Sequence, residues 1–134
     1  YLATVDKFAF SDDSRTTLGT GLSEARRYPS AMANSGTAGY VAGGYTGSRV
    51  ATVDKFAFSD DSRTTLGTGL SAGTSHLAAM ADSGTAGYVG GGLDSTYTAK
   101  VDKFAFSDDS RTTLASGLSS ARYALSAFAN SGSL

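Results

Sequence analysis

The residues of this chain with the most binding chemistry are arginines, tyrosines and a single histidine, and they gather in short connecting segments. One kind of segment follows each Leu-Ser pair of the sequence, and the other follows each double glycine. The candidate binding residues in them are Arg26, Arg27, Tyr28, Tyr45, Arg49, His76, Asp94, Tyr97, Arg122 and Tyr123. Arg and Tyr are enriched among the residues that dominate binding energy at interfaces, so this set predicts recognition of another molecule.

The same residues do not predict a catalytic or metal site. His76 is the only histidine and the chain contains no cysteine, so no nucleophile–base pair and no metal-ligand cluster is indicated. Asp12 and Asp13 alone supply too few oxygen ligands for Ca²⁺, and we expect them to hold the backbone of a turn instead. The repeated Asp and Arg residues occur in symmetric copies, whereas catalysis needs different groups at one place. We therefore expect no enzyme activity, no cofactor and no metal.

A 48-residue repeat positions these segments. Residues 3–23 read ATVDKFAFSDDSRTTLGTGLS, residues 51–71 are identical, and residues 99–119 are a near copy. The units are therefore 3–50, 51–98 and an incomplete 99–134, and together they make one domain over 1–134. The chain opens inside a unit, and from this we expect a fragment, a processed chain or a deliberately shortened chain.

Each 48-residue period predicts four short strands, named a to d. Counted from strand a, one period has them near residues 31–34, 39–45, 50–58 and 63–66, with turn residues between them. No stretch has a 3.6-residue apolar period long enough for a stable helix. Because Phe and Val occupy both faces of the third strand, each sheet needs a neighbour on either side. This pattern predicts an all-β propeller of four-stranded antiparallel blades, with about 2.8 blades in the chain.

The double glycines carry a resemblance to a known family. YVAGG at 40–44 and YVGGG at 88–92, with VDKF at 53–56, resemble kelch repeats, whose period is close to this one. A fourth-strand Trp that kelch blades usually carry is replaced here by Thr17, Thr65 and Thr113, so the chain resembles a divergent branch. The turn SDDSRTTL at 11–18 also resembles, in part, the Asp-box of sialidase-type propellers.

The near-verbatim tandem copies resemble the kelch-like arrays of phage tail and fibre proteins and of some bacterial surface proteins. That resemblance implies adhesion or host recognition, with a virion or extracellular location. The copies differ only in the d–a and b–c connections, which an up-down blade places on one face. We therefore expect a non-catalytic recognition or adhesion module that binds a glycan or a surface protein through that face.

The same repeats are compatible with three alternatives. The variation between copies can be drift without a function. The chain can be a structural, self-assembling propeller, natural or engineered, with no ligand. It can also belong to a propeller enzyme whose catalytic segment lies elsewhere in a longer protein.

Charge and blade number limit the partners. Eleven Lys and Arg against twelve Asp and Glu leave no basic stripe, so we expect no nucleic-acid partner. No apolar run reaches the roughly 18–20 residues of a membrane helix, so we expect no membrane insertion. A closed propeller has roughly four to eight blades, so closure requires either self-association, two copies giving about six blades, or the remainder of a longer chain.

Overall fold

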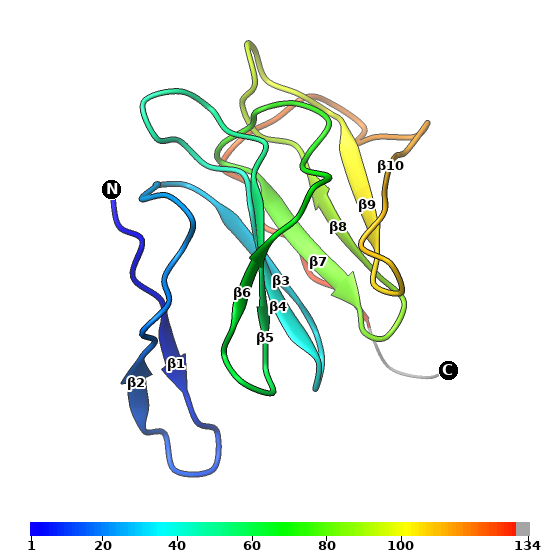
Figure 1. Ribbon diagram of the computed structural model, residues 1–134. Coiled ribbons are helices and arrows are strands. Elements are labelled where there is room, and N and C mark those ends of the chain that lie inside the picture. The colour runs from blue at the N-terminus through cyan, green and yellow to red at the C-terminus, as the bar shows by residue number, and fades with distance from the viewer. Residues whose placement is uncertain (131–134) are drawn as a thin grey trace.

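The computed structural model describes residues 1–130, and within them the protein is built from antiparallel β-strands without a helix (Figure 1). Its strands are β1 (Asp6–Phe8), β2 (Arg15–Thr17), β3 (Ser30–Asn34), β4 (Ala38–Ala42), β5 (Val53–Ala57), β6 (Arg63–Thr65), β7 (Ala78–Asp82), β8 (Ala86–Gly90), β9 (Val101–Ala105) and β10 (Arg111–Thr113). The described part of the chain contains no helix that could span a membrane. The all-β, antiparallel prediction is confirmed.

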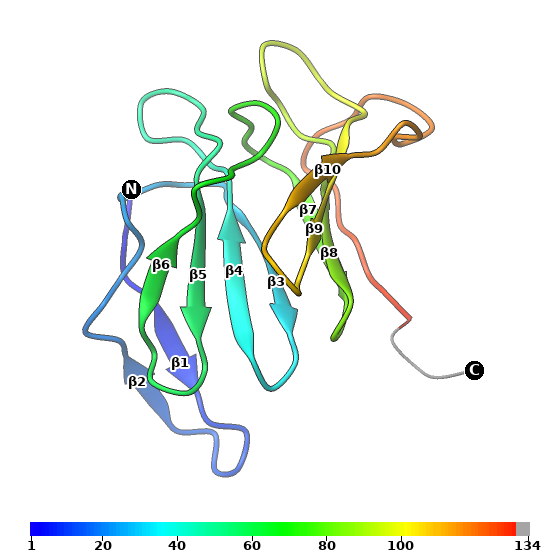
Figure 2. The same ribbon diagram turned by 45° about the vertical axis from the view of Figure 1, so that its right-hand side comes forward.

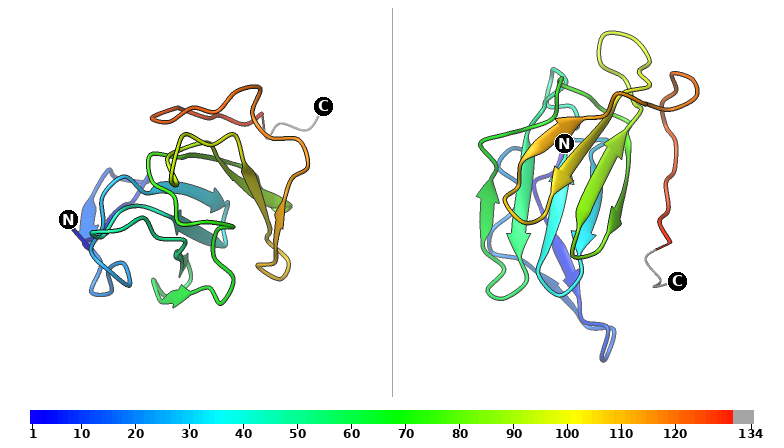
Figure 3. Two further views of the ribbon diagram at one scale, coloured as in Figure 1. Left: turned by 90° about the horizontal axis from the view of Figure 1, so that it is seen from above. Right: turned by 90° about the vertical axis from the view of Figure 1, so that its right-hand side faces the viewer.

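The strands form one hairpin and two sheets that follow one another in space. The hairpin is β1–β2, and the four-stranded sheets have the orders β3-β4-β5-β6 and β7-β8-β9-β10. Both sheets share one register, since Tyr40 pairs with Lys55 and Tyr88 pairs with Lys103. Figure 3 shows an open series of hairpin, first sheet and second sheet, without closure into a ring over residues 1–130.

Aspartates fix the turns of the strand pairs β1–β2, β5–β6 and β9–β10. Asp12, Asp60 and Asp108 each accept a hydrogen bond of 3.0 Å from the backbone N–H of the serine two residues later. The residue between them has a left-handed backbone in all three units, with φ of 56–57° at Asp13, Asp61 and Asp109. Aspartate tolerates this conformation better than most residues, which explains the Asp-Asp pair of each turn.

The core lies between successive units rather than inside one sheet. Strand β3 packs on β7 and β8. The Met32 side chain of β3 fills the space above Gly87 of β8, where a Cβ would lie only 2.2 Å from the Met32 sulfur. Burial therefore depends on a neighbouring unit and not on sequence alone. The equivalent phenylalanines Phe8, Phe56 and Phe104 are 57%, 6% and 0% exposed.

Polar contacts between units recur with the repeat. The Lys7 ammonium lies 2.8 Å from a carboxylate oxygen of Asp61, and Lys55 lies 2.7 Å from Asp109. Asp54 of β5 accepts hydrogen bonds of 2.9 Å from the backbone N–H and the hydroxyl of Ser23 in the preceding unit. Asp54 and Lys55 thus both bind the neighbouring units through their charged groups.

Candidate functional site

The variable connections lie together at one end of the sheets (Figure 2). They are the β2–β3, β6–β7 and post-β10 segments, 18–29, 66–77 and 114–125, and the β4–β5 and β8–β9 segments, 43–52 and 91–100. We call this end the loop end. The short turns inside each strand pair lie at the opposite end, which we call the turn end. The predicted location of the variable segments on one face therefore agrees with the topology.

The double glycines tie the loops of neighbouring units together. Gly43 and Gly44 have φ of 65° and 114°, and the Gly44 N–H donates a 2.8 Å hydrogen bond to the carbonyl of Thr74 in the next unit. A Cβ on Gly43 would lie only 2.5 Å from that same carbonyl oxygen. Close backbone approach, together with a left-handed φ, requires glycine at this position.

Gly43→Ala is accordingly expected to lower the free energy of unfolding by about 1–3 kcal/mol, because it adds backbone strain and displaces the Thr74 carbonyl. Gly19→Ala is the matched control, since a Cβ there meets nothing within 4 Å and no left-handed φ is involved. Urea unfolding of both variants measures the difference. Equal midpoints for the two would contradict the role of Gly43 in joining the units.

A backbone ladder crosses the loop end at one position of the repeat. Tyr28, His76 and Ala124, spaced by 48 residues, have left-handed φ values of 58°, 57° and 51°. The His76 N–H donates to the Tyr28 carbonyl at 3.0 Å, and the Ala124 N–H donates to the His76 carbonyl at 2.9 Å. Non-glycine residues held in this region are uncommon and concentrate at functional sites, so the ladder marks this part of the loop end as a candidate site.

Arg27 lies at the centre of a cluster of tyrosines beside this ladder. Its guanidinium carbon is 5.0, 5.2 and 5.1 Å from the ring centroids of Tyr1, Tyr28 and Tyr45. Backbone hydrogen bonds of 3.1 and 2.8 Å between Arg27 and Tyr45 join the two loops that carry them. These cation–π distances lie within the range at which the ring face attracts a cation.

Further rings extend the cluster across the next two units. Tyr28 stacks on His76 at 3.9 Å between centroids, His76 meets Tyr123 edge-on at 6.0 Å, and Tyr123 stacks on Tyr97 at 4.5 Å. The neighbouring Tyr123 side chain raises the pKa of Tyr97. We call the whole set the aromatic row: Tyr1, Arg27, Tyr28, Tyr45, His76, Tyr97 and Tyr123.

The aromatic row is open to solvent. Tyr1, Tyr28, Tyr97 and Tyr123 are between 45% and 59% exposed, although the rings pack on one another. Such rings offer apolar area together with a polar hydroxyl at the tip, held in place with little loss of conformational freedom on binding. The row can therefore bind a ligand by stacking and hydrogen bonding without a large rearrangement.

Arg26 does not belong to this surface, and its prediction as an exposed binding residue is wrong. It is 3% exposed, and its Nη2 lies 2.6 Å from a carboxylate oxygen of Asp54, which is also buried. Its Nε and Nη1 are buried without a hydrogen bond to the described residues. Arg26 turns inward because the Asp54 carboxylate of β5 lies beside it, and its role is to neutralise that charge.

Several hydrogen bonds set the protonation of Asp54. Burial by itself would raise the pKa of this carboxyl group, but the backbone N–H of Ser23, the hydroxyls of Thr65 and Ser23, and the Arg26 guanidinium together lower it. Burial lowers the pKa of Arg26, against the opposing effect of Asp54. The Asp54 carboxylate is thus ionised at neutral pH, and folding favours its ionised form.

This shift predicts a pH dependence of stability. Because the pKa of Asp54 is lower in the folded than in the unfolded chain, its contribution is complete above the ordinary value of 3.8 and is lost as the pH falls through the folded pKa. The stability difference between the wild type and Asp54→Asn is expected to be constant near neutral pH and to shrink below 3.8. Urea unfolding of both proteins at a series of pH values measures this stability difference. A difference that grows in acid would contradict the lowered pKa of Asp54. Asp82→Asn, at an exposed position, controls for the change of charge.

Three more of the predicted residues lie at the loop end but outside the aromatic row. Asp94 caps its own turn, accepting hydrogen bonds from the backbone N–H of Ser95 and Thr96, and pairs with Lys100 at 3.3 Å. Arg49 is half-buried, and Arg122 is exposed and donates to the hydroxyls of Ser119 and Ser120. The row thus contains six of the ten predicted residues, namely Arg27, Tyr28, Tyr45, His76, Tyr97 and Tyr123.

Tyr1 is the row member that sequence reasoning missed. It lies 48 residues before Arg49 and twice that distance before Tyr97, so the repeat alone places it in the same variable position. Applying the repeat period to the first residue would have found it.

The described residues hold no group of three or more His, Cys, Asp or Glu side chains that could bind a metal ion. No protein-family model and no curated protein matches the sequence. The resemblance to kelch repeats therefore stays a prediction.

Proposed function

We propose that this protein is a non-catalytic recognition or adhesion module that binds a glycan or a surface protein through the aromatic row at the loop end. The observation that carries the proposal is the continuous row of exposed rings that begins at Tyr1, surrounds Arg27 and ends at Tyr97. Tyrosine and arginine dominate the energetics of many interfaces, and loops held by a rigid scaffold are the usual place for recognition.

We further infer that the sheets are blades of a kelch-like propeller. The four-stranded antiparallel meander, the shared register of the two sheets and the packing of β3 on β7 and β8 support this inference. A ring of roughly four to eight blades then contains further units beyond those described here. The resemblance to phage tail and bacterial surface arrays adds a virion or extracellular location to the proposal.

Recognition fits the loop end better than catalysis. The one contact there between a hydroxyl and a histidine nitrogen, among the hydrogen bonds of the described side chains, joins Ser75 Oγ to His76 Nδ1 at 3.1 Å. Ser75 is only 1% exposed, so its hydroxyl is not accessible to a substrate, and the His76 ring is stacked on Tyr28. A nucleophile and its base must both reach the reacting atom, and this pair does not.

The proposal is tested by screening the wild-type chain on a glycan array and a panel of cell-surface proteins, then titrating the strongest soluble hit. Tyr28→Ala is expected to weaken that binding about tenfold or more, because it removes a ring at the centre of the row. Phe10→Ala removes an exposed ring from the turn end and is expected to leave the affinity unchanged. An absence of hits, or equal losses for the two variants, would contradict the proposal.

A further inference from the structure

We propose that the two ends of the open series are complementary, so that a second copy of this chain docks head to tail. In this arrangement the β1–β2 end of one copy covers the outer face of the β7–β10 sheet of the other. This docking uses the ends of the series, not the loop end, and does not depend on ligand binding by the aromatic row. The contacts that join neighbouring units inside one chain would form in the same way between the end units of two copies.

The first contact is an ion pair between a third-strand lysine and a turn aspartate 54 residues later. Lys7 pairs with Asp61 and Lys55 pairs with Asp109 at this spacing. Lys103 occupies the next such position and has no carboxylate partner among residues 1–130; its ammonium lies 5.8 Å from the ring centroid of Tyr88. The open turn aspartate of the same kind is Asp13, at the other end of the series, with the same left-handed φ as Asp61. Lys103 of one copy therefore meets Asp13 of the second copy.

The second contact joins a loop serine and arginine to the strand aspartate of the following unit. Ser23 and Arg26 hold Asp54 at 2.9 and 2.6 Å. Ser119 and Arg122 stand at the same positions of the last unit, where Arg122 turns back and donates to Ser119 instead.

The matching aspartate at the opposite end is Asp6, whose side chain is 41% exposed and held by Thr17 and Arg15 at 2.6 and 3.0 Å. Docking presents its carboxylate to Ser119 and Arg122 of the other copy. Lys103 and Arg122 of one copy thus face Asp13 and Asp6 of the other, and these complementary charges favour the head-to-tail joint.

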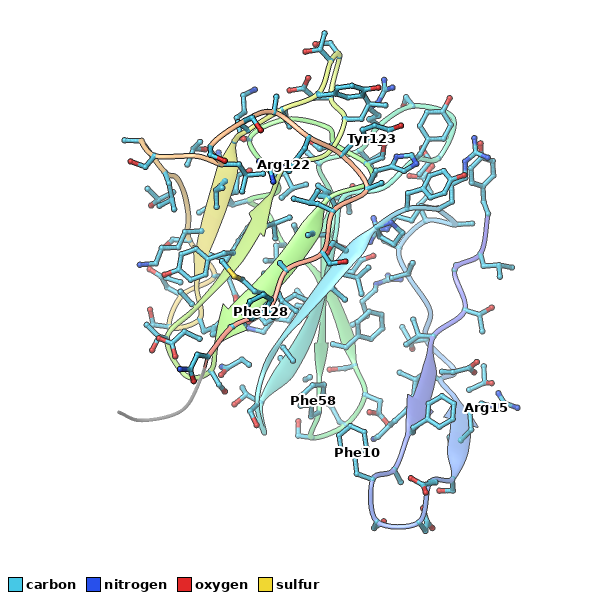
Figure 4. All side chains as sticks on the ribbon, turned by 180° about the vertical axis from the view of Figure 1, so that it is seen from behind. Phe10, Arg15, Phe58, Arg122, Tyr123 and Phe128 are labelled. Atoms are coloured by element: carbon cyan, nitrogen blue, oxygen red, sulfur yellow. The ribbon has the colours of Figure 1, made fainter. Side chains whose placement is uncertain are left out.

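The third contact is apolar. Inside the chain Met32 fills the space above Gly87, and Phe128 takes the place of Met32 in the last unit, where it is 91% exposed (Figure 4). Gly39, which corresponds to Gly87, lines a groove of about 380 Å³ between the β1–β2 hairpin and the first sheet, together with Phe8 and Phe56. Phe128 of one copy enters this groove beside Gly39 of the second copy, and the two apolar surfaces exclude water.

The joint is made by side chains rather than by a continuous strand ladder. The segment around Phe128 takes the position of β3 or β7, and β1 of the second copy takes the position of β5 or β9. The strand between them, equivalent to β4 or β8, is supplied by neither copy within the described residues. The ion pairs at Asp6 and Asp13 and the Phe128 contact therefore determine the strength of the joint.

Sedimentation velocity of the 134-residue chain over a concentration series tests the proposal. The wild type is expected to self-associate, and Lys103→Asp and Asp13→Lys are each expected to weaken association about tenfold or more, since like charges then face each other. The double variant, and an equimolar mixture of the two single variants, are expected to restore it. Glu24→Lys, a reversal of an exposed charge that takes part in none of these contacts, is the matched control.

Phe128→Ala is a second test that does not depend on the charge variants. Because Phe128 is exposed in the single chain, its replacement is not expected to affect folding. It is expected to weaken association, while Tyr97→Ala in the aromatic row is expected to leave it unchanged. Circular dichroism confirms that each variant is folded. A wild type that stays monomeric at every concentration, or charge reversals without mutual rescue, would overturn the head-to-tail joint and leave the recognition proposal untouched.

Discussion

Asp54→Ala is expected to lower the free energy of unfolding by about 3–5 kcal/mol, because it leaves the Arg26 guanidinium buried without a counter-charge. Both side chains of this ion pair are fully buried, and Arg26 already has two nitrogen atoms without a hydrogen bond to the described residues. The substitution also removes the acceptor for Ser23 of the preceding unit. Urea or thermal unfolding measures the loss.

Asp6→Ala is the matched control for this prediction, since Asp6 occupies the same repeat position in an identical stretch of sequence. Its pair with Arg15 is exposed, so its removal is expected to change stability little. If the two variants lost equal stability, local sequence would determine the effect and the contact between units would not. A comparison of the two therefore separates the effect of local sequence from that of the neighbouring unit.

Phe104→Ala is expected to destabilise the protein by about 3–5 kcal/mol, the usual range for removing a buried aromatic ring. Phe104 is 0% exposed and belongs to the core formed between the two sheets. The cavity that the substitution leaves is enclosed by neighbouring strands and does not fill by collapse. Chemical unfolding with a shared baseline for wild type and variant gives the difference.

Phe8→Ala makes the same substitution in the same sequence context, DKFAF, but Phe8 is 57% exposed. Its loss is expected to stay within about 0.5 kcal/mol, as for other surface substitutions. A large loss at Phe8 would mean that the groove between the hairpin and the first sheet, which Phe8 lines, is already filled in solution. That outcome would itself agree with docking of a second copy, and Phe8→Ala should then also weaken self-association.

The strands were predictable from the sequence because the strand sequences recur in successive units with the same spacing. The β-prone residues of VDKFA and the small residues of SAMAN match β5 and β3 closely, and the Ser-Asp-Asp-Ser turns are closed by aspartate as the residue types indicate. The period of 48 residues also accounts for the register that both sheets share.

The candidate site was predictable only in part, because burial depends on the neighbouring unit. Arg26 and Arg27 are adjacent in sequence, yet one neutralises Asp54 in the interior and the other lies among exposed tyrosine rings. The stacking of Tyr28 on His76 needs both residues in a left-handed backbone, which neither residue type indicates by itself. Residue types in a loop give its chemistry, but the side that each residue faces comes from packing.

Part of the variation between units is structural. The position of Arg26 is taken by Thr74 in the next unit, and there the corresponding Asp102 lies 3.5 Å from Arg111 instead. The difference at this position therefore reflects two ways to neutralise a strand aspartate. The recognition proposal accordingly rests on the aromatic row, and Arg26 takes no part in it.

The most direct test of the recognition proposal is a two-dimensional NMR titration of the chain with the glycan or protein fragment that binds most strongly in the screen. The proposal predicts that shifted backbone resonances cluster in the loop end, at Tyr28, His76 and Tyr123 and in the segments next to them. Resonances of the turn end, around Asp60 and Asp108, should stay in place. Shifts concentrated at the turn end or on the outer strands, with the aromatic row unchanged, would contradict it.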